Sequence, residues 1–230
     1  MGETSKDKKQ CAYCENGDGS EDKEHIPPKS LYKPLPQNLI TVPSCRACNK
    51  GFQKDDDYFR LVMASRGEAN EQDSATQPMQ AAIRGLNKER AIGFAKMVAS
   101  QMDRKEVVSP GGIHLGMQTI MNADGERIHA TVERIGRGLY FHECGNRIPD
   151  THEIEVLLLQ EQMLKGNAPL KQIVSLFKTE DFVEIGDGVF SYSFLPSGGD
   201  PERCDAWILE FYKTTCFLVT VFPSPSSELR

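Results

Sequence analysis

The stretch that decides the fold runs from Cys11-Ala12-Tyr13-Cys14 to Cys45-Arg46-Ala47-Cys48. A C-x-x-C turn presents two thiolates from one tight piece of backbone, and two such turns supply the four soft ligands of a tetrahedral structural zinc site. A segment of about 40 residues cannot bury a useful hydrophobic core by itself. We therefore expect Zn²⁺ to supply much of its folding free energy, on the order of 10 kcal/mol.

The residues between the two cysteine pairs carry a second set of chemical groups. Glu24-His25 precedes two prolines, Asn38 precedes a short β-favouring run that Pro43 ends, and Asn49 directly follows the last cysteine. Neighbouring side chains on an extended strand point to opposite faces. A local bend is therefore needed if Glu24 and His25 are to serve one site.

Together these motifs resemble those of the HNH endonucleases, the zinc-stapled branch of the ββα-metal nucleases. That family has a C-x-x-C pair, an acidic residue followed by histidine, a nearby proline, an Asn-Leu that opens the second strand, and a C-x-x-C followed by histidine or asparagine. Each part is present in the same order here: Cys11-x-x-Cys14, Glu24-His25-x-Pro27, Asn38-Leu39 and Cys45-x-x-Cys48-Asn49. The resemblance covers residues 11 to about 60, roughly a quarter of the chain.

The resemblance implies a role for each of these polar residues. His25 would be the general base that deprotonates a water attacking a phosphodiester, which suits an imidazole because its unperturbed pKa of about 6.5 lies near neutral pH. Glu24 and Asn49 would hold one divalent cation, Mg²⁺ or Mn²⁺, through oxygen atoms. Asn38 would bond the backbone across the loop and fix the orientation of His25. The substrate would be DNA, with basic side chains contacting its phosphates: Lys29, Lys33, Arg46, Lys50 and Lys54.

Three positions depart from the usual family pattern. Glu24 stands where aspartate is common, Asn49 stands where histidine is common, and Phe52 stands where a lysine is often found. An amide is a weaker ligand than an imidazole, which favours a metal that prefers oxygen ligands.

Composition limits the class of protein. The 230 residues are 39% hydrophobic and 26% charged, as in ordinary soluble proteins. No apolar run approaches the roughly 20 residues of a membrane span, and the first nine residues lack the apolar region of a secretory signal. We expect a cytoplasmic protein. The net charge is −6, but residues 1–66 carry 11 Lys/Arg against 10 Asp/Glu, so any phosphate binding would be local. The remaining cysteines, Cys144, Cys204 and Cys216, indicate buried small side chains and no disulfide framework.

Residues beyond the cysteine-rich segment predict an α+β protein with a mostly antiparallel sheet. We divide the chain into a nuclease module at 1–66, a helical linker at 67–106 and an α+β domain of unknown role at 107–230. A helix restarts at Asp55, another covers 78–104 with a break left open at 85–87, and a third covers 169–178. Residues 126–141 fit either a hairpin strand after Asp124-Gly125 or a helix, with Gly136 and Gly138 weighing against the helix. Strands are expected at 153–159, 182–185, 189–195, 207–212 and 216–222, with the last two forming a hairpin.

Three functions follow as expectations. The first is metal-dependent hydrolysis of DNA phosphodiesters. The second is a non-catalytic zinc module that docks on nucleic acid or protein. The third is a toxin or defence nuclease controlled by a regulatory partner or ligand. Residues 67–230 are also candidates for homodimer formation. A pure binding module has no need of Glu24, His25 and Asn49 together, and these residues separate the first function from the second.

Overall fold

The computed structural model describes residues 10–15, 22–66, 69, 72–109, 111–198 and 204–224. Its N-terminal part is a hairpin of β1 (Asp22–Ile26) and β2 (Ile40–Ser44), followed by the helix α1 (Arg46–Ser65). The strands pair antiparallel without a register shift, with Glu24 opposite Val42 and His25 opposite Thr41. The chain therefore folds locally in the order strand, strand, helix.

Helix α1 is continuous, which corrects the predicted restart at Asp55. Its first turn is capped by Cys45, whose sulfur accepts a hydrogen bond from the Cys48 amide. Gly51 lies inside the helix, and a side chain at that position would meet open space. A single exposed glycine costs a helix only about 1 kcal/mol, which packing of the buried face of α1 offsets.

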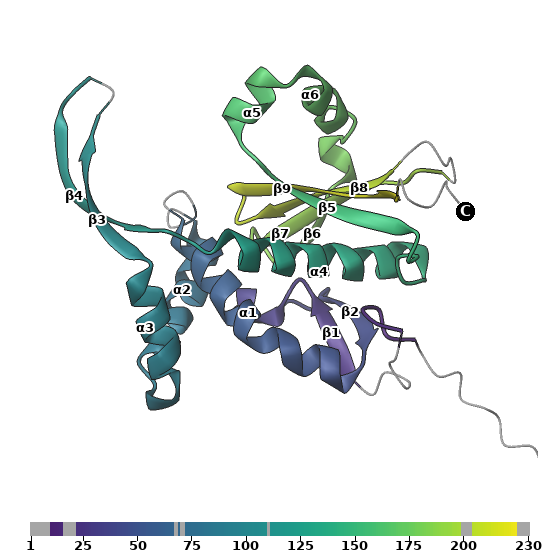
Figure 1. The fold of residues 1–230 in the computed structure, drawn as a ribbon, viewed down its shortest axis with the longest axis horizontal. Coiled ribbons are helices and arrows are strands. Elements are labelled where there is room, and N and C mark those ends of the chain that lie inside the picture. The colour runs from purple at the N-terminus through teal and green to yellow at the C-terminus, as the bar shows by residue number, and fades with distance from the viewer. Residues whose placement is uncertain are drawn as a thin grey trace, which may run out of the picture.

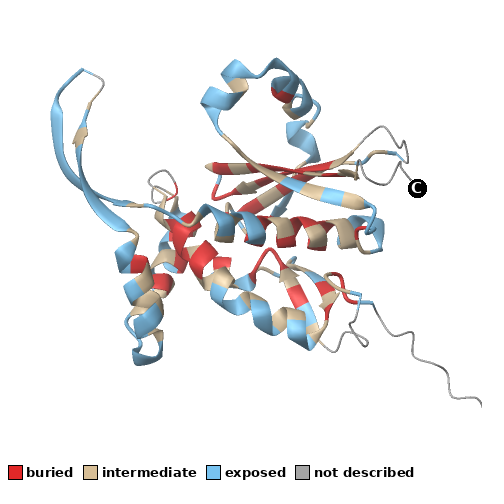
Figure 2. Cartoon of the chain, in the orientation of Figure 1, coloured by how far each residue is buried: buried red, intermediate tan, exposed pale blue. Residues whose placement is uncertain are grey.

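The predicted helix over 78–104 is two helices, divided at the break left open at 85–87, and its last residues belong to a strand. Helix α2 (Asp73–Leu86) begins before Pro78 and contains it, and α3 (Ile92–Ser100) follows the short helical turn η3 (Glu89–Ala91). Strand β3 (Met102–Val108) then pairs antiparallel with β4 (His114–Met121). This second hairpin projects away from the body of the molecule (Figure 1), and most of its residues are exposed (Figure 2).

Residues 126–141, which the sequence left open, belong to the helix α4 (Gly125–Cys144). The Asp124 carboxylate caps it by accepting a hydrogen bond from the Arg127 amide, and Gly145, in the left-handed region with φ 74°, ends it. The Asp-Gly pair is therefore a helix start.

The C-terminal part is a five-stranded antiparallel sheet in the order β5-β9-β8-β7-β6, which confirms the mostly antiparallel α+β prediction. Two short helices, α5 (Glu161–Gly166) and α6 (Ala168–Val174), lie on the sheet face opposite α4 (Figure 1). The strands are β5 (His152–Leu159), β6 (Val183–Ile185), β7 (Phe190–Leu195), β8 (Asp205–Phe211) and β9 (Thr215–Pro223).

Helix α4 lies between the N-terminal hairpin and the five-stranded sheet (Figure 1). Its two glycines explain how closely these layers approach. A side chain at Gly136 would come within 2.8 Å of Val219 on β9, and one at Gly138 within 2.4 Å of Ile26 on β1. The glycines that argued against a helix are therefore required by the contacts on its two sides.

One hydrophobic core crosses the predicted boundaries at residues 66 and 107. It joins Ile26 and Val42 of the first hairpin, Phe59 of α1, and Trp207 and Phe211 of β8. The Phe59 and Phe211 rings meet edge to face with centroids 5.2 Å apart. The N-terminal segment is therefore one wall of a shared core. Among the described residues, no helix is both long enough and apolar enough to cross a membrane.

Candidate functional site

The four cysteines of the two C-x-x-C pairs come together as the sequence predicts. The sulfur atoms of Cys11, Cys14, Cys45 and Cys48 all lie within 4.8 Å of one another. Sulfur atoms at the usual zinc distance of about 2.3 Å form a tetrahedron with edges of about 3.8 Å, and Cys14 Sγ lies 3.7 Å from Cys45 Sγ. The cluster therefore has a geometry that could hold a metal ion such as zinc.

Backbone amides surround this cluster and favour thiolate ligands. The amides of Tyr13 and Cys45 donate to Cys11 Sγ at 3.4 and 3.3 Å, and the Cys48 amide donates to Cys45 Sγ at 3.5 Å. The Cys48 amide lowers the pKa of Cys45 to about 7. Burial, followed by the neighbouring thiols, raises the pKa of Cys48. Four adjacent thiolates need a cation to balance their charge, which is what a structural metal provides.

Strand β1 places Glu24 and His25 on opposite faces. Its pairing with β2 is regular at both residues, so the local bend that would turn both toward one point is absent from β1. Glu24 is buried, whereas His25 is half-buried. Burial and the nearby Lys29 charge lower the pKa of His25. The imidazole is therefore neutral at physiological pH, as a proton acceptor must be.

Glu24 takes part in a buried charge cluster that the sequence did not indicate. Arg134 of α4 donates to Glu24 Oε1 at 2.8 Å and also pairs with Asp56 of α1. The Arg134 guanidinium lies over the Phe52 ring, 4.3 Å from its centroid. Burial raises the pKa of Glu24 to about 7, against the opposing effect of Arg134. Arg134 thus links α4 both to β1 and to α1.

This arrangement does not present Glu24 as a ready ligand for a catalytic cation. Its carboxylate is held by Arg134 inside the protein. Within the described part of the chain, the only group of three or more His, Cys, Asp or Glu side chains placed to hold a metal is the four-cysteine cluster. A cation reaches Glu24 only if the ion pair with Arg134 opens.

The two asparagines have different surroundings. Asn49, in the first turns of α1, donates from Nδ2 to the Lys23 carbonyl at 3.2 Å, which fastens the helix to β1 beside Glu24 and His25. Its Oδ1 has no hydrogen-bond partner among the described residues. Asn38 donates from Nδ2 to the Glu184 carbonyl of β6 at 2.9 Å. This bond ties the β1–β2 loop to the five-stranded sheet, in place of the expected bond across the loop of His25.

The predicted phosphate contacts lie on the surface of the same segment. Arg46, Lys50 and Lys54 are exposed and recur every four residues on α1, so they form one row along the helix. Lys29 and Lys33, in the β1–β2 connection, are also exposed.

Sequence reasoning missed Arg134 and Asp56. Asp56 stands in the acidic run 55–57, which reads as a helix cap or a solvated face, and Arg134 stands inside an apolar stripe. The signal in the sequence is the spacing of residues along α1. Asn49, Phe52 and Asp56 lie on one face of a continuous helix, and that face meets the hairpin. Only a prediction of the full-length helix would have placed Asp56 inward.

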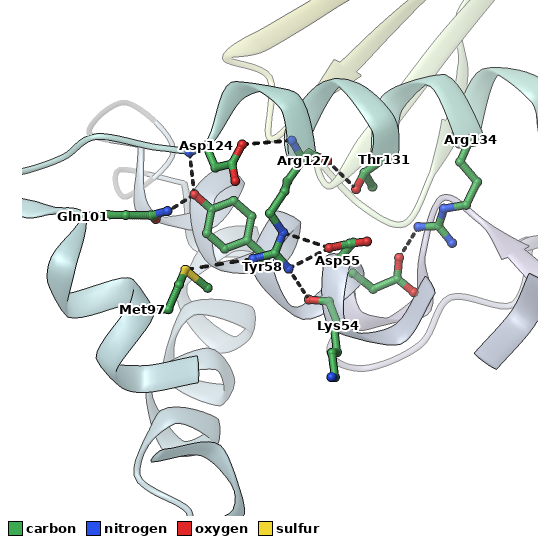
Figure 3. A network of polar contacts seen from close by, with 10 residues as sticks. Lys54, Asp55, Tyr58, Met97, Gln101, Asp124, Arg127, Thr131 and Arg134 are labelled. Atoms are coloured by element: carbon green, nitrogen blue, oxygen red, sulfur yellow. Dashed lines mark hydrogen bonds and ion pairs between the residues drawn. The ribbon is translucent and has the colours of Figure 1, made fainter. Parts of the chain in front are cut away.

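Asp55 belongs to a second network, at the junction of α1, α3 and α4 (Figure 3). Arg127 donates to Asp55 Oδ1 from Nε at 2.8 Å and from Nη2 at 2.6 Å, and it lies over the Tyr58 ring. Tyr58 donates from its hydroxyl to Gln101 at 2.8 Å and accepts from the Asp124 amide. The network fixes both ends of the exposed hairpin β3–β4 to the helices, because Gln101 precedes β3 and Asp124 follows β4.

Comparison with protein-family models, with curated proteins and with solved structures finds no match to this chain.

Proposed function

We propose that the N-terminal segment is a zinc-stapled nuclease module that hydrolyses phosphodiester bonds in DNA, with His25 as its general base. The observation that carries the proposal is the four-cysteine cluster. It joins the β1–β2 hairpin to the start of α1, and Asn49, which directly follows the last cysteine, contacts the strand that carries His25. The HNH-like order of the motifs supports the same conclusion.

His25 performs the proton transfer in this proposal. One nitrogen of its neutral imidazole accepts a proton from a water molecule, the water oxygen attacks phosphorus, and the bond to the leaving oxygen breaks. The lowered pKa keeps the imidazole able to accept this proton near neutral pH. Zn²⁺ in the cysteine cluster holds the hairpin and takes no part in the reaction.

A divalent cation, Mg²⁺ or Mn²⁺, is part of the proposal and would stabilise charge on the reacting phosphate. Asn49 Oδ1 is the ligand that the structure leaves available. Glu24 becomes a second ligand only if its carboxylate releases Arg134 and binds the cation instead.

The test is plasmid cleavage with Mg²⁺ or Mn²⁺ by the wild type and three variants. We expect His25→Ala to lose activity by about 10²-fold or more and His152→Ala, a histidine on β5, to cleave normally. Glu24→Gln keeps the shape of the side chain and removes its charge, so loss of cleavage with unchanged melting would identify the carboxylate as a cation ligand, whereas loss of both would point to the broken pair with Arg134. Equal cleavage by wild type and His25→Ala would refute the catalytic assignment.

The burial of Glu24 favours a second candidate, a zinc module that binds nucleic acid without cleaving it. In that case Glu24 is structural and its pairing with Arg134 is permanent. The wild type would then bind DNA and leave it intact with either cation.

A further inference from the structure

A basic cleft lies beside the proposed nuclease module, bounded by α1, α2 and α3. Its volume is about 1090 Å³. Seven of its lining residues are lysine or arginine and one, Asp57, is acidic, although the whole chain has a net charge of −6. Such a concentration of one charge in a concave site attracts anions.

Most of these cations are available to a ligand. Arg60 pairs with Asp57, and Arg127 pairs with Asp55. The other five have no ion pair among the described residues and are exposed: Lys33, Lys54, Arg84, Lys88 and Arg90. They come from the β1–β2 connection, α1, α2 and the turn before α3, so they surround the cleft.

The lining of the cleft between these cations is apolar. Leu61 and Ala82 are buried there, and Phe94 and Met97 are half-buried. Cations around an apolar surface that includes an aromatic ring are typical of single-strand binding, where phosphates meet the charges and bases stack on rings. A duplex presents only its phosphates to such a site, because its bases are already stacked and paired.

The cleft is continuous with the proposed nuclease module through α1. The exposed row of Arg46, Lys50 and Lys54 begins at the cysteine cluster, and its last member lines the cleft. A strand that follows this row therefore passes from the hairpin of His25 to α2 and α3.

We propose that this cleft binds a single-stranded segment of nucleic acid, with phosphates at its basic rim and a base against Phe94. The proposal deepens the proposed function by naming a single strand as the bound form. It assigns substrate binding to α2 and α3, which lie outside the HNH-like segment.

The test measures binding without cleavage, in a His25→Ala background with no added divalent cation. The probes are a fluorescein-labelled single strand and a duplex, each of about 20 nucleotides per strand, a length that covers one binding site. Fluorescence anisotropy gives Kd over roughly 50 to 200 mM salt. The cleft variant is Arg84→Gln/Lys88→Gln/Arg90→Gln. Its control, Lys165→Gln/Lys171→Gln/Lys178→Gln, removes the same charge from exposed positions around α5 and α6.

We expect the single strand to bind more tightly than the duplex. The cleft variant should weaken single-strand binding at least tenfold and reduce the slope of log Kd against log salt by about 2, from three lost phosphate contacts at about 0.7 each. The control should change Kd less than twofold. Phe94→Leu keeps an apolar side chain, and it should weaken single-strand binding about tenfold without changing the salt slope.

Equal losses in the cleft and control variants would overturn the proposal, because net charge alone would then explain binding. Tighter binding of the duplex, or a cleft variant that binds like its parent, would overturn it too. Thermal melting of each variant checks folding. These outcomes do not depend on cleavage, so the cleft proposal can fail while His25 is catalytic, and it can hold while His25 is not.

Discussion

The described residues form two separate two-stranded hairpins, β1–β2 and β3–β4, with opposite surroundings. In β1–β2, alternate side chains are buried beneath α1 and α4, and the cysteine cluster closes the end next to α1. In β3–β4, almost every residue is exposed, including Leu115 at 60% and Met117 at 56% (Figure 2).

A two-stranded hairpin alone is at best marginally stable in water. The comparison therefore shows what stabilises each of them. The first hairpin is held by a four-cysteine cluster that could bind a metal ion, by a buried charge cluster and by two helices. The second depends on its own pairing and on the Tyr58–Arg127 network at its base. The residues that we propose for catalysis lie on the stabilised hairpin.

The largest effect that separates the hairpins should come from the cysteine cluster. Cys45→Ser removes one thiolate ligand, and loss of the metal should cost on the order of 10 kcal/mol and unfold the N-terminal segment. Metal analysis should find about one zinc per chain in the wild type and none in the variant, and circular dichroism should follow unfolding. Cys144→Ser is the control, because Cys144 is exposed, which corrects the burial predicted from the sequence. Unchanged melting of Cys45→Ser with zinc retained would contradict the assignment.

The second effect comes from the buried charge cluster over the first hairpin. Arg134→Met leaves the buried Glu24 and the half-buried Asp56 without their cation, so it should lower the free energy of unfolding by about 3–5 kcal/mol. Arg137→Met on the same helix breaks only the partly exposed pair with Glu133 and should cost about 0.5 kcal/mol. Chemical denaturation of both variants checks this. A similar cost for the two would show that the cluster contributes no more than a surface pair.

The third effect tests how tightly the first hairpin fits under α4. Gly138→Ala puts a methyl group against Ile26 and should destabilise the protein by about 1–3 kcal/mol. Gly93→Ala, in α3, meets open space and should stabilise by about 0.5–1 kcal/mol. The two variants should therefore shift Tm in opposite directions, and a shift in the same direction would argue against the close packing at Gly138.

The smallest effect compares the two hairpins with one substitution. Val42 is 2% exposed and Val108 is 46% exposed. Val42→Ala should cost about 1–2 kcal/mol through lost apolar burial, whereas Val108→Ala should change stability by no more than about 0.5 kcal/mol. Urea denaturation measures both. A larger cost at Val108 would mean that the exposed hairpin packs against something in solution.

The sequence predicts elements well where one local pattern decides them. The cysteine spacing predicts the cluster, and β-favouring runs separated by turns predict β5 to β9 within about two residues at each end. Prediction fails where a distant contact decides. Gly136 and Gly138 oppose a helix locally, but they fit because β9 and β1 leave no room for side chains there.

The candidate site likewise combines features that a local pattern predicts with contacts that only the folded chain makes. The motif order nominates the residues of the candidate site, but it does not predict where Glu24 points. Its partner Arg134 lies 110 residues away in the sequence, and a regular strand directs Glu24 and His25 apart. The sequence does not predict the basic cleft either, because only the folded chain brings Lys33, Lys54 and Arg84 together around it.

Gly136 and Gly138 leave two sides of α4 without side chains. This has a consequence for any attempt to move the N-terminal segment into another protein. Because Gly138 lets Ile26 rest against the helix backbone, and Phe59 reaches Phe211, residues 10–65 have a complementary surface made by the rest of the chain. A fragment cut after Ser65 would carry that surface exposed to water. The strand that carries His25 is therefore held in place by parts of the chain more than 70 residues further on. The segment cannot be moved into another protein on its own.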